Sequence, residues 1–253
     1  MPPRPLQTRD TRMTATAQPV SSPDLSDLLR GGTRSAGGWT GDWDARRAGL
    51  CLGVIVIGAG LYGAAMGIWR DPLQAGFNVF KFPLVICATT LGNALLNGML
   101  APLLGLDLRF RQSLMLVLMS FTIASAILGA FAPLVGFIIW NTPPLVPGVE
   151  LPWTVYNFVQ LVQVAVIAFA GVAANVRLLR LLEARAGSRL VAQKVLFAWL
   201  AGNLFLGSQL CWILRPFIGS PGLPVQFLRP NAFAGNFYET VFHAVLRLLS
   251  LND

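Results

Sequence analysis

Charged side chains are scarce in this 253-residue sequence. Asp, Glu, Lys and Arg make up only 12% of the chain and hydrophobic residues make up 55%, whereas ordinary soluble proteins carry about 25% charged residues. So few charges cannot cover the surface of a water-soluble globule, which excludes an ordinary soluble fold. The composition indicates a chain whose main solvent is lipid.

Histidine and cysteine are almost absent as well. Cys51, Cys87 and Cys211 all fall in apolar segments and form no CxxC pair, so the sequence predicts neither a disulfide framework nor a thiolate metal site. The sole histidine, His243, follows Glu239 by four residues, but no second histidine or cysteine joins them as a metal ligand. We therefore expect no metal and no cofactor.

The usual catalytic groups are missing from the apolar segments. None of the spans predicted below holds an Asp, Glu, Lys, Arg or His near its centre, and no GxSxG nucleophile motif occurs. Proton-coupled transport and acid/base chemistry would lack their usual residues. The sequence favours a protein that is not an enzyme.

Long uncharged apolar runs are what the sequence has instead. A helix rising 1.5 Å per residue needs about 20 apolar residues to cross a hydrocarbon core roughly 30 Å thick. Such runs predict an all-α polytopic membrane protein, a five-transmembrane-helix bundle within residues 45–214. The predicted spans are about 48–69, 82–106, 114–140, 153–176 and 195–214.

The segments outside these spans differ in composition. Residues 1–44 are rich in Pro, Ser, Thr, Arg and Gly, which predicts a disordered tail. Residues 72–81, PLQAGFNVFK, place apolar side chains at helical spacing, which is typical of a segment lying flat in the interface. Residues 215–253 predict a proline-rich loop followed by an amphipathic helix on the membrane surface.

Two further features predict the shape and packing of the spans. Pairs of small residues four apart in the first span favour close helix contacts: Gly49 with Gly53, Gly60 with Ala64, and Gly63 with Gly67. Pro133 predicts a kink in the third span, and Pro83 is expected to open the second.

The distribution of basic residues predicts the orientation, because Lys and Arg favour the cytoplasmic side. With five spans, nine basic residues fall on the side of the N-terminus: Arg46, Arg47, Arg109, Arg111, Arg177, Arg180, Arg185, Arg189 and Lys194. The opposite side receives five: Arg70, Lys81, Arg215, Arg229 and Arg247. The N-terminus is therefore expected in the cytoplasm, and the protein in the inner (plasma) membrane.

Amide side chains are the most conspicuous polar groups inside the spans. Asn93 and Asn97 lie one turn apart on the second span, and Asn203 and Gln209 lie on the fifth. Because each amide has a donor and an acceptor, amides on two helices can satisfy one another. Helix packing is the favoured interpretation; the alternative is a small polar cavity shared with Thr89, Thr90, Gln160, Gln163 and Asn175.

Three charges near the C-terminus also admit two interpretations. Arg215, Arg229 and Glu239 could extend to the interface as isolated surface charges. Alternatively, the outer loop forms an ordered cap in which an arginine pairs with Glu239 or with a lipid phosphate.

The chain resembles the Yip family of five-span membrane proteins. The resemblance is carried by the five spans, the polar proline-containing N-terminal tail and the interfacial stretch leading into KFPLV at residues 81–85, and it covers roughly residues 70–214. It implies a five-helix membrane domain and a link to vesicle traffic through Rab GTPases.

The chain is also similar to a bacterial membrane family in segments such as FPLVICATTLGNALLNGMLAPLLGL. Some members of that family bear a label for an actin-binding Wiskott-homology motif. DLSDLLRGGTR, at residues 24–34, has the paired leucines of that motif but not its lysine-rich segment, so we do not expect actin binding.

These observations predict a non-enzymatic inner-membrane protein that organises lipid or recruits a partner. Its expected partners are the lipid bilayer and a protein bound by the N-terminal tail or by the basic loop 177–194; nucleic acid is not expected. The alternative is an oligomeric channel or transporter subunit for a small polar solute, and a homo-oligomer is left open.

Overall fold

Five long helices make up most of the chain that the structure describes. The computed structural model describes residues 44–145, 153–219, 223–239 and 241–242. No strand occurs in these residues, and all five helices are long and apolar enough to cross a membrane. The helices are α3 (Ala45–Gly67), α4 (Pro72–Leu103), α5 (Phe110–Trp140), α6 (Trp153–Ala186) and α7 (Arg189–Ile213). The predicted all-α class and five-span polytopic character are confirmed.

The helix ends follow from local sequence. The Asp44 carboxylate accepts a hydrogen bond from the Arg46 amide at 2.9 Å, and Asp71 caps α4 through the Leu73 amide at 2.8 Å, with Pro72 in the first turn. At the other end of α4, Gly105 adopts a φ of 88°, and Gly187 after α6 adopts a φ of 61°. Glycine tolerates this left-handed backbone, which stops a helix and reverses the chain.

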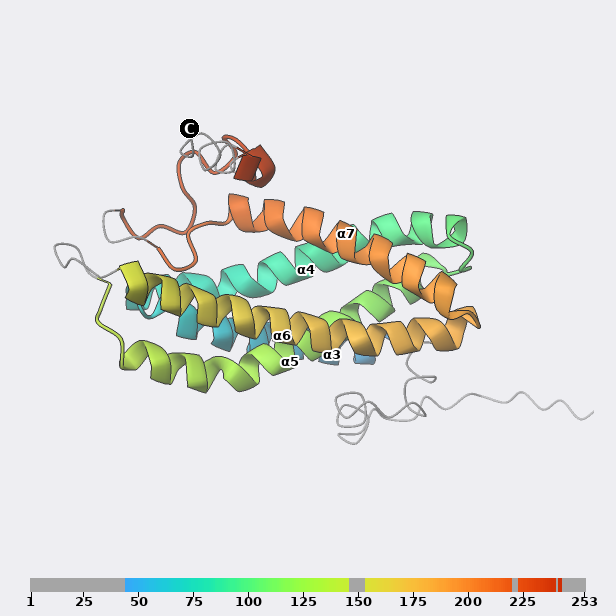
Figure 1. Cartoon of the computed structure of the whole chain (residues 1–253), viewed down its shortest axis with the longest axis horizontal. Coiled ribbons are helices and arrows are strands. Elements are labelled where there is room, and N and C mark those ends of the chain that lie inside the picture. The colour runs from blue at the N-terminus through green and yellow to red at the C-terminus, as the bar shows by residue number, and fades with distance from the viewer. Residues whose placement is uncertain (1–43, 146–152, 220–222, 240, 243–253) are drawn as a thin grey trace, which may run out of the picture.

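The helices form a ring of neighbours. They pack in the order α3, α5, α6, α7 and α4, which returns to α3, and α4 also contacts α5. We call the end with residues 68–71, 141–145 and 214–219 the loop end, and the end with residues 104–109 and 187–188 the short-turn end. At the loop end α7 stops before α5 and α6 do, and the chain continues as a loop (Figure 1).

The outside of the ring is apolar. Large side chains such as Ile57, Leu161 and Phe197 are 66%, 67% and 75% exposed, although they would normally be buried in a soluble protein. In a lipid solvent this exposure has no hydrophobic cost. The membrane interpretation therefore explains the surface as well as the helix lengths.

The inner face of α4 is polar. Seven of its polar or charged side chains are at most 3% exposed: Gln74, Asn78, Lys81, Thr89, Thr90, Asn93 and Asn97. They recur three or four residues apart except for one gap at Val85, so they share one side of the helix. The bundle thus keeps its polar groups inside and its apolar groups outside.

Close helix contact depends on glycines of α3, but only on some of those predicted. A methyl group at Gly63 would lie 2.6 Å from the Asn78 carbonyl oxygen, and one at Gly67 would lie 2.8 Å from Ala75 Cα. Gly49 and Gly53, in contrast, have open space beside them. The tightest crossing lies at Gly58, where a methyl group would overlap the Ser125 carbonyl of α5.

The prediction that residues 72–81 lie flat in the interface is wrong. These residues form the first turns of α4, which runs unbroken through Pro83 and past Asn97. Asp71 and Pro72 start the helix ten residues earlier than expected, so Pro83 does not open it. Leu73 and Phe80 lie on the lipid-facing side of α4, whereas Phe77 is half-buried and packs against Phe227 of the loop.

The loop predicted at residues 177–194 is also wrong. Helix α6 continues to Ala186 and α7 begins at Arg189, so only Gly187 and Ser188 connect them. The five basic residues of this region lie on the ends of α6 and α7, beyond the predicted apolar spans. They therefore lie on a helical hairpin at the short-turn end and not in a loop.

Two other predictions concern Pro133 and the C-terminal region, of which the structure describes only a part. Pro133 lies inside α5, which remains helical from Phe110 to Trp140. Residues 223–230 carry no helix, as the prolines predict, and 237–239 and 241–242 are helical. The tail (1–43), including residues 24–34, and most of the predicted amphipathic helix (243–253), including His243 and Arg247, lie outside the described residues.

Candidate functional site

Two amide side chains at the loop end of α4 bind the loop that follows α7. Gln74 Nε2 donates to the Pro216 carbonyl at 2.8 Å, and Asn78 Nδ2 donates to the Phe217 carbonyl at 2.7 Å. Gln74 Nε2 also lies 3.1 Å from Asn78 Oδ1. These bonds satisfy loop carbonyls that have no helix to accept them, as a membrane interior requires.

Lys81 extends the same contact deeper along α4. Its fully buried ammonium donates to the carbonyls of Pro216 at 3.0 Å and Gln226 at 3.4 Å. The ammonium also lies 5.2 Å from the Phe227 ring centroid and 5.9 Å from those of Phe77 and Phe217, within range of cation–π attraction. No carboxylate pairs with Lys81 among the described residues.

Lys81 is buried inside the bundle, although it does not lie near the centre of its span, where the sequence predicts no charge. The sequence placed Lys81 just before the second span, at the interface. Because α4 begins at Pro72, Lys81 is the tenth residue of a 32-residue helix, inside the bundle. The prediction failed because the start of the helix was placed too late.

Amides join α4 to α7 further along the helix. Asn93 Nδ2 donates to Asn203 Oδ1 at 2.6 Å and reaches the Trp199 carbonyl at 3.3 Å. Gly202 permits this approach, since a methyl group there would lie 2.6 Å from Asn93 Oδ1. This is the contact that the helix-packing hypothesis requires of Asn93 and Asn203.

The other amides singled out from the sequence have different surroundings. Asn97 is fully buried, and neither its amide nitrogen nor its oxygen has a hydrogen-bond partner in the described residues. Gln209 is half-buried on α7, and no hydrogen bond joins it to another described residue. The structure therefore brings together only two of the four predicted amides.

The other polar residues of the proposed cavity make no hydrogen bond to Asn93: Thr89 Oγ1 has no partner among the described residues. Thr90 and Asn175 each donate to a carbonyl of their own helix, those of Ile86 and Gly171. Gln163 accepts a hydrogen bond from Tyr62, and Gln160 lies in the cavity described next.

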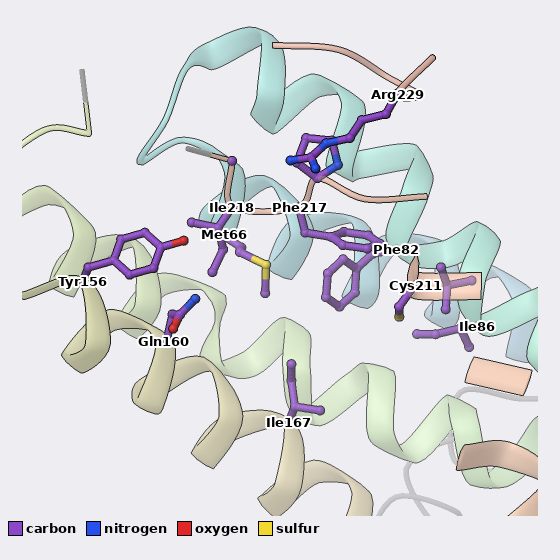
Figure 2. A pocket seen from close by; sticks show the side chains of 13 residues that line it. Met66, Phe82, Ile86, Tyr156, Gln160, Ile167, Cys211, Phe217, Ile218 and Arg229 are labelled. Atoms are coloured by element: carbon purple, nitrogen blue, oxygen red, sulfur yellow. The ribbon is translucent and has the colours of Figure 1, made fainter. Parts of the chain in front are cut away.

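A mainly apolar cavity of about 480 Å³ lies between α3, α4, α6, α7 and the loop. Figure 2 shows Tyr156, Gln160 and Ile167 of α6 on one side, with Phe82 and Ile86 of α4 and Cys211 of α7 on the other. Phe217, Ile218 and Arg229 cover it at the loop end. Its volume is in the range of small-molecule sites, about 300–1,000 Å³.

This cavity reaches the lipid-facing surface. Ile167 is 42% exposed, and Gln160 and Cys211 are also exposed, so the side between α6 and α7 is open. Helix α7 ends at Ile213, and the loop that replaces it crosses over α4, which leaves this space unfilled. No pattern in the sequence indicated it, because its lining comes from four helices and a loop.

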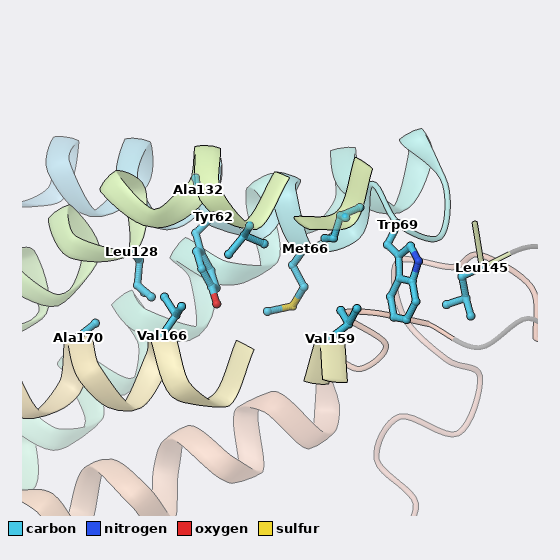
Figure 3. Close-up of a cluster of buried hydrophobic side chains, with 11 residues drawn as sticks. Tyr62, Met66, Trp69, Leu128, Ala132, Leu145, Val159, Val166 and Ala170 are labelled. Atoms are coloured by element: carbon cyan, nitrogen blue, oxygen red, sulfur yellow. The ribbon is translucent and has the colours of Figure 1, made fainter. Parts of the chain in front are cut away.

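The inner wall of the cavity is well packed. Met66 belongs both to the lining and to a core cluster with Tyr62, Trp69 and Leu145, which Figure 3 shows between α3, α5 and α6. Tyr62 is fully buried and donates its hydroxyl to Gln163 Oε1. Trp69 Nε1 donates to the Pro143 carbonyl at 2.9 Å. The wall is therefore fixed by hydrogen bonds as well as by packing.

A second, more polar pocket of about 370 Å³ adjoins the first. It is lined by Arg215, Arg229 and residues of the loop, including Gln226 and Asn231. Arg229 lines both spaces, so one guanidinium lies where the apolar cavity and the polar pocket meet.

The charged residues near the C-terminus that were singled out from the sequence contact neighbours in the chain but do not pair with one another. Arg215 follows α7, stacks over the Trp212 ring at 3.6 Å and donates to the Trp212 carbonyl. Burial, and then the nearby charge of Arg229, lower the pKa of Arg215. Glu239 bonds to Asn236, and among the described residues it forms no ion pair with Arg215 or Arg229.

The described residues contain no group of three His, Cys, Asp or Glu side chains that could hold a metal. No protein-family model, curated protein or solved structure matches this chain. The resemblance to Yip proteins and to the bacterial family therefore has no support beyond the five-span architecture.

Proposed function

We propose that this chain is a non-enzymatic inner-membrane protein, with its N-terminus in the cytoplasm, that organises lipid. In this proposal the cavity between α6 and α7 receives the acyl part of a membrane amphiphile. The loop that caps the cavity keeps the site at one membrane surface.

The lateral opening of the cavity carries this proposal. Lipid tails already cover the exposed side chains of α6 and α7, so a chain can enter sideways without crossing water. The lining is apolar apart from Tyr156, Gln160 and Arg229 and the backbone of the loop. Each methylene group that leaves water on entry contributes about 0.8 kcal/mol, but entry from lipid does not gain this, so affinity has to come from shape and from the polar edge.

The proposal also includes the recruitment of a partner by the helical hairpin around Gly187 and by the N-terminal tail. The helical hairpin around Gly187 carries Arg177, Arg180, Arg185, Arg189 and Lys194 beyond the apolar spans. Such a group attracts anionic lipid headgroups or an acidic protein segment. The N-terminal tail is proposed to recruit a protein partner.

Lipid retention tests the proposal. We expect the full chain, purified in mild detergent, to keep at least one lipid in native mass spectrometry. Ile167→Trp should fill the cavity and reduce that lipid severalfold. Val164→Trp, on the same helix but 62% exposed to lipid, is the matched control and should retain it.

Equal retention by both variants would contradict a lipid site in the cavity. The same preparations in vesicles test the alternative function. Solute flux that disappears when Asn93 and Asn97 are both replaced by leucine, with stability unchanged, would support a conduit in place of lipid organisation.

A further inference from the structure

Three cations, Lys81, Arg215 and Arg229, lie near one another at the loop end, and none of them forms an ion pair with a described carboxylate. Arg229 is close enough to Lys81 and to Arg215 to repel both of them electrostatically. The salt bridges of Arg47 with Asp44 and of Arg189 with Glu183 involve none of these three cations. No described ion pair therefore neutralises the positive charge of these three residues.

The three cations differ in the groups that contact them. Carbonyls and aromatic rings surround Lys81, and Arg215 is held by the ring and carbonyl of Trp212. The guanidinium of Arg229 has no hydrogen-bond or ion-pair partner among the described residues. It is half-buried at the junction of the apolar cavity and the polar pocket. Figure 2 labels it among the residues that line the apolar cavity.

The depth of this junction is that of lipid headgroups. Trp140, which is 89% exposed, ends α5 at this end, and Trp212 lies in the last turn of α7, where interfacial tryptophans are expected. Arg215 follows α7 by two residues. An amphiphile whose tail occupies the apolar cavity would place its polar head against both arginines.

We infer that this edge is a binding site for an anionic phospholipid, with an acyl chain in the 480 Å³ cavity and the phosphate at Arg229 and Arg215. This inference rests on the proposed function and names its ligand. Guanidinium groups bind phosphate oxygens through paired, charge-assisted hydrogen bonds. A zwitterionic headgroup would fit less well, because its ammonium would be repelled by Arg229 and Arg215, neither of which is paired with a described carboxylate.

Lipid competition in detergent tests the inference with phosphatidylglycerol and phosphatidylcholine of the same acyl chains. Native mass spectrometry of the wild-type protein should give at least a roughly tenfold preference for phosphatidylglycerol, because both lipids carry the phosphate but only phosphatidylcholine adds an ammonium that the arginines repel. Arg229→Gln should reduce that preference to within about threefold. Arg229→Lys, which keeps the charge but not the paired donors, should be intermediate.

Arg111→Gln is the matched control, since it removes an exposed arginine at the short-turn end and should keep the preference. Folding is checked separately. Because Arg229 repels Lys81 and Arg215, Arg229→Gln should leave thermal stability without added lipid unchanged or higher, and should lose only the stabilisation by phosphatidylglycerol.

Three results overturn the inference. One is an equal affinity of the wild type for the two lipids, and another is a preference that survives in Arg229→Gln. The third is full competition by glycerol phosphate, which has no acyl chain and would indicate a simple anion site. If lipid still binds without a charge preference and Ile167→Trp removes it, the proposed function stands and only the headgroup assignment fails; if no lipid binds, both fail.

Discussion

Asn93 and Asn97 lie one turn apart on the same face of α4, yet only Asn93 has a partner. Its amide bonds to Asn203 and to the Trp199 carbonyl, whereas the amide of Asn97 is buried without a hydrogen bond to any described residue. A hydrogen bond between membrane helices contributes about 0.6 kcal/mol on average and up to about 1.7. An unsatisfied buried amide costs free energy instead.

Leucine substitutions should therefore separate the two residues. Asn93→Leu is expected to lower the free energy of unfolding in detergent micelles by about 0.5–1.7 kcal/mol. Asn97→Leu should change it little or raise it. Asn203→Leu combined with Asn93→Leu should cost less than the sum of the two single changes, because both remove the same bond. A larger loss at Asn97 than at Asn93 would contradict this assignment.

At the scale of elements, the crossing of α3 and α5 is set by two glycines. A methyl group at Gly129 would lie 2.8 Å from Gly58 Cα, and one at Gly58 would overlap the Ser125 carbonyl. Backbone atoms cannot move aside as a flexible side chain can, so either change must push the helices apart. Gly49, on the same helix α3, faces open space.

We expect Gly58→Ala to lower the free energy of unfolding by about 1–3 kcal/mol or more, measured by thermal or denaturant unfolding in detergent. Gly49→Ala is the control and should be neutral or stabilise by up to about 1 kcal/mol, since alanine favours helix over glycine. Gly58→Ala and Gly129→Ala together should not be additive, because the two positions touch. Equal effects at Gly58 and Gly49 would contradict close packing at this crossing.

Sequence patterns predicted the elements better than their ends or contacts. Hydropathy was sufficient for five spans, because backbone in lipid must form hydrogen bonds within a helix. It missed the first ten residues of α4, where apolar and polar side chains alternate between lipid and the bundle interior. Small-residue spacing found Gly63 and Gly67 but also selected Gly49 and Gly53, because spacing does not say which face meets a neighbour.

The candidate site was less accessible to sequence analysis than the helices. Arg215 and Arg229 were recognised as charges near a membrane surface, and lipid phosphate was one of their proposed partners. The apolar cavity beside them depends on where α7 stops and how the loop crosses α4. Contacts such as Lys81 with Pro216 join residues 135 positions apart, and one sequence gives no measure of such pairings.

At the scale of the whole molecule, five helices put the two ends of the described bundle on opposite membrane faces. Asp107 and Ser188 lie in the connections at the short-turn end, and Asn141 and Leu223 lie in those of the loop end, all four with exposed side chains. Single cysteines at these positions report the topology directly. The background for them is the chain with Cys51, Cys87 and Cys211 replaced by alanine.

We expect Asp107→Cys and Ser188→Cys to react with an impermeant maleimide from one side of the membrane, the cytoplasmic side in the proposed orientation. Asn141→Cys and Leu223→Cys should react only from the opposite side. Reaction of Ser188→Cys and Leu223→Cys from the same side would exclude a crossing by α7. Reaction of Asp107→Cys from outside the cell would reverse the proposed orientation without changing the number of crossings.

The bonds from Lys81 to the loop also constrain the order in which the protein can be completed. Lys81 is translated 135 residues before Pro216, whose carbonyl accepts the hydrogen bond from the Lys81 ammonium. At about 5–20 residues per second, that interval is on the order of ten seconds. Until Pro216 is translated, this ammonium has to be hydrated at the membrane surface, so the loop end of α4 can reach its final position only after α7 has been made.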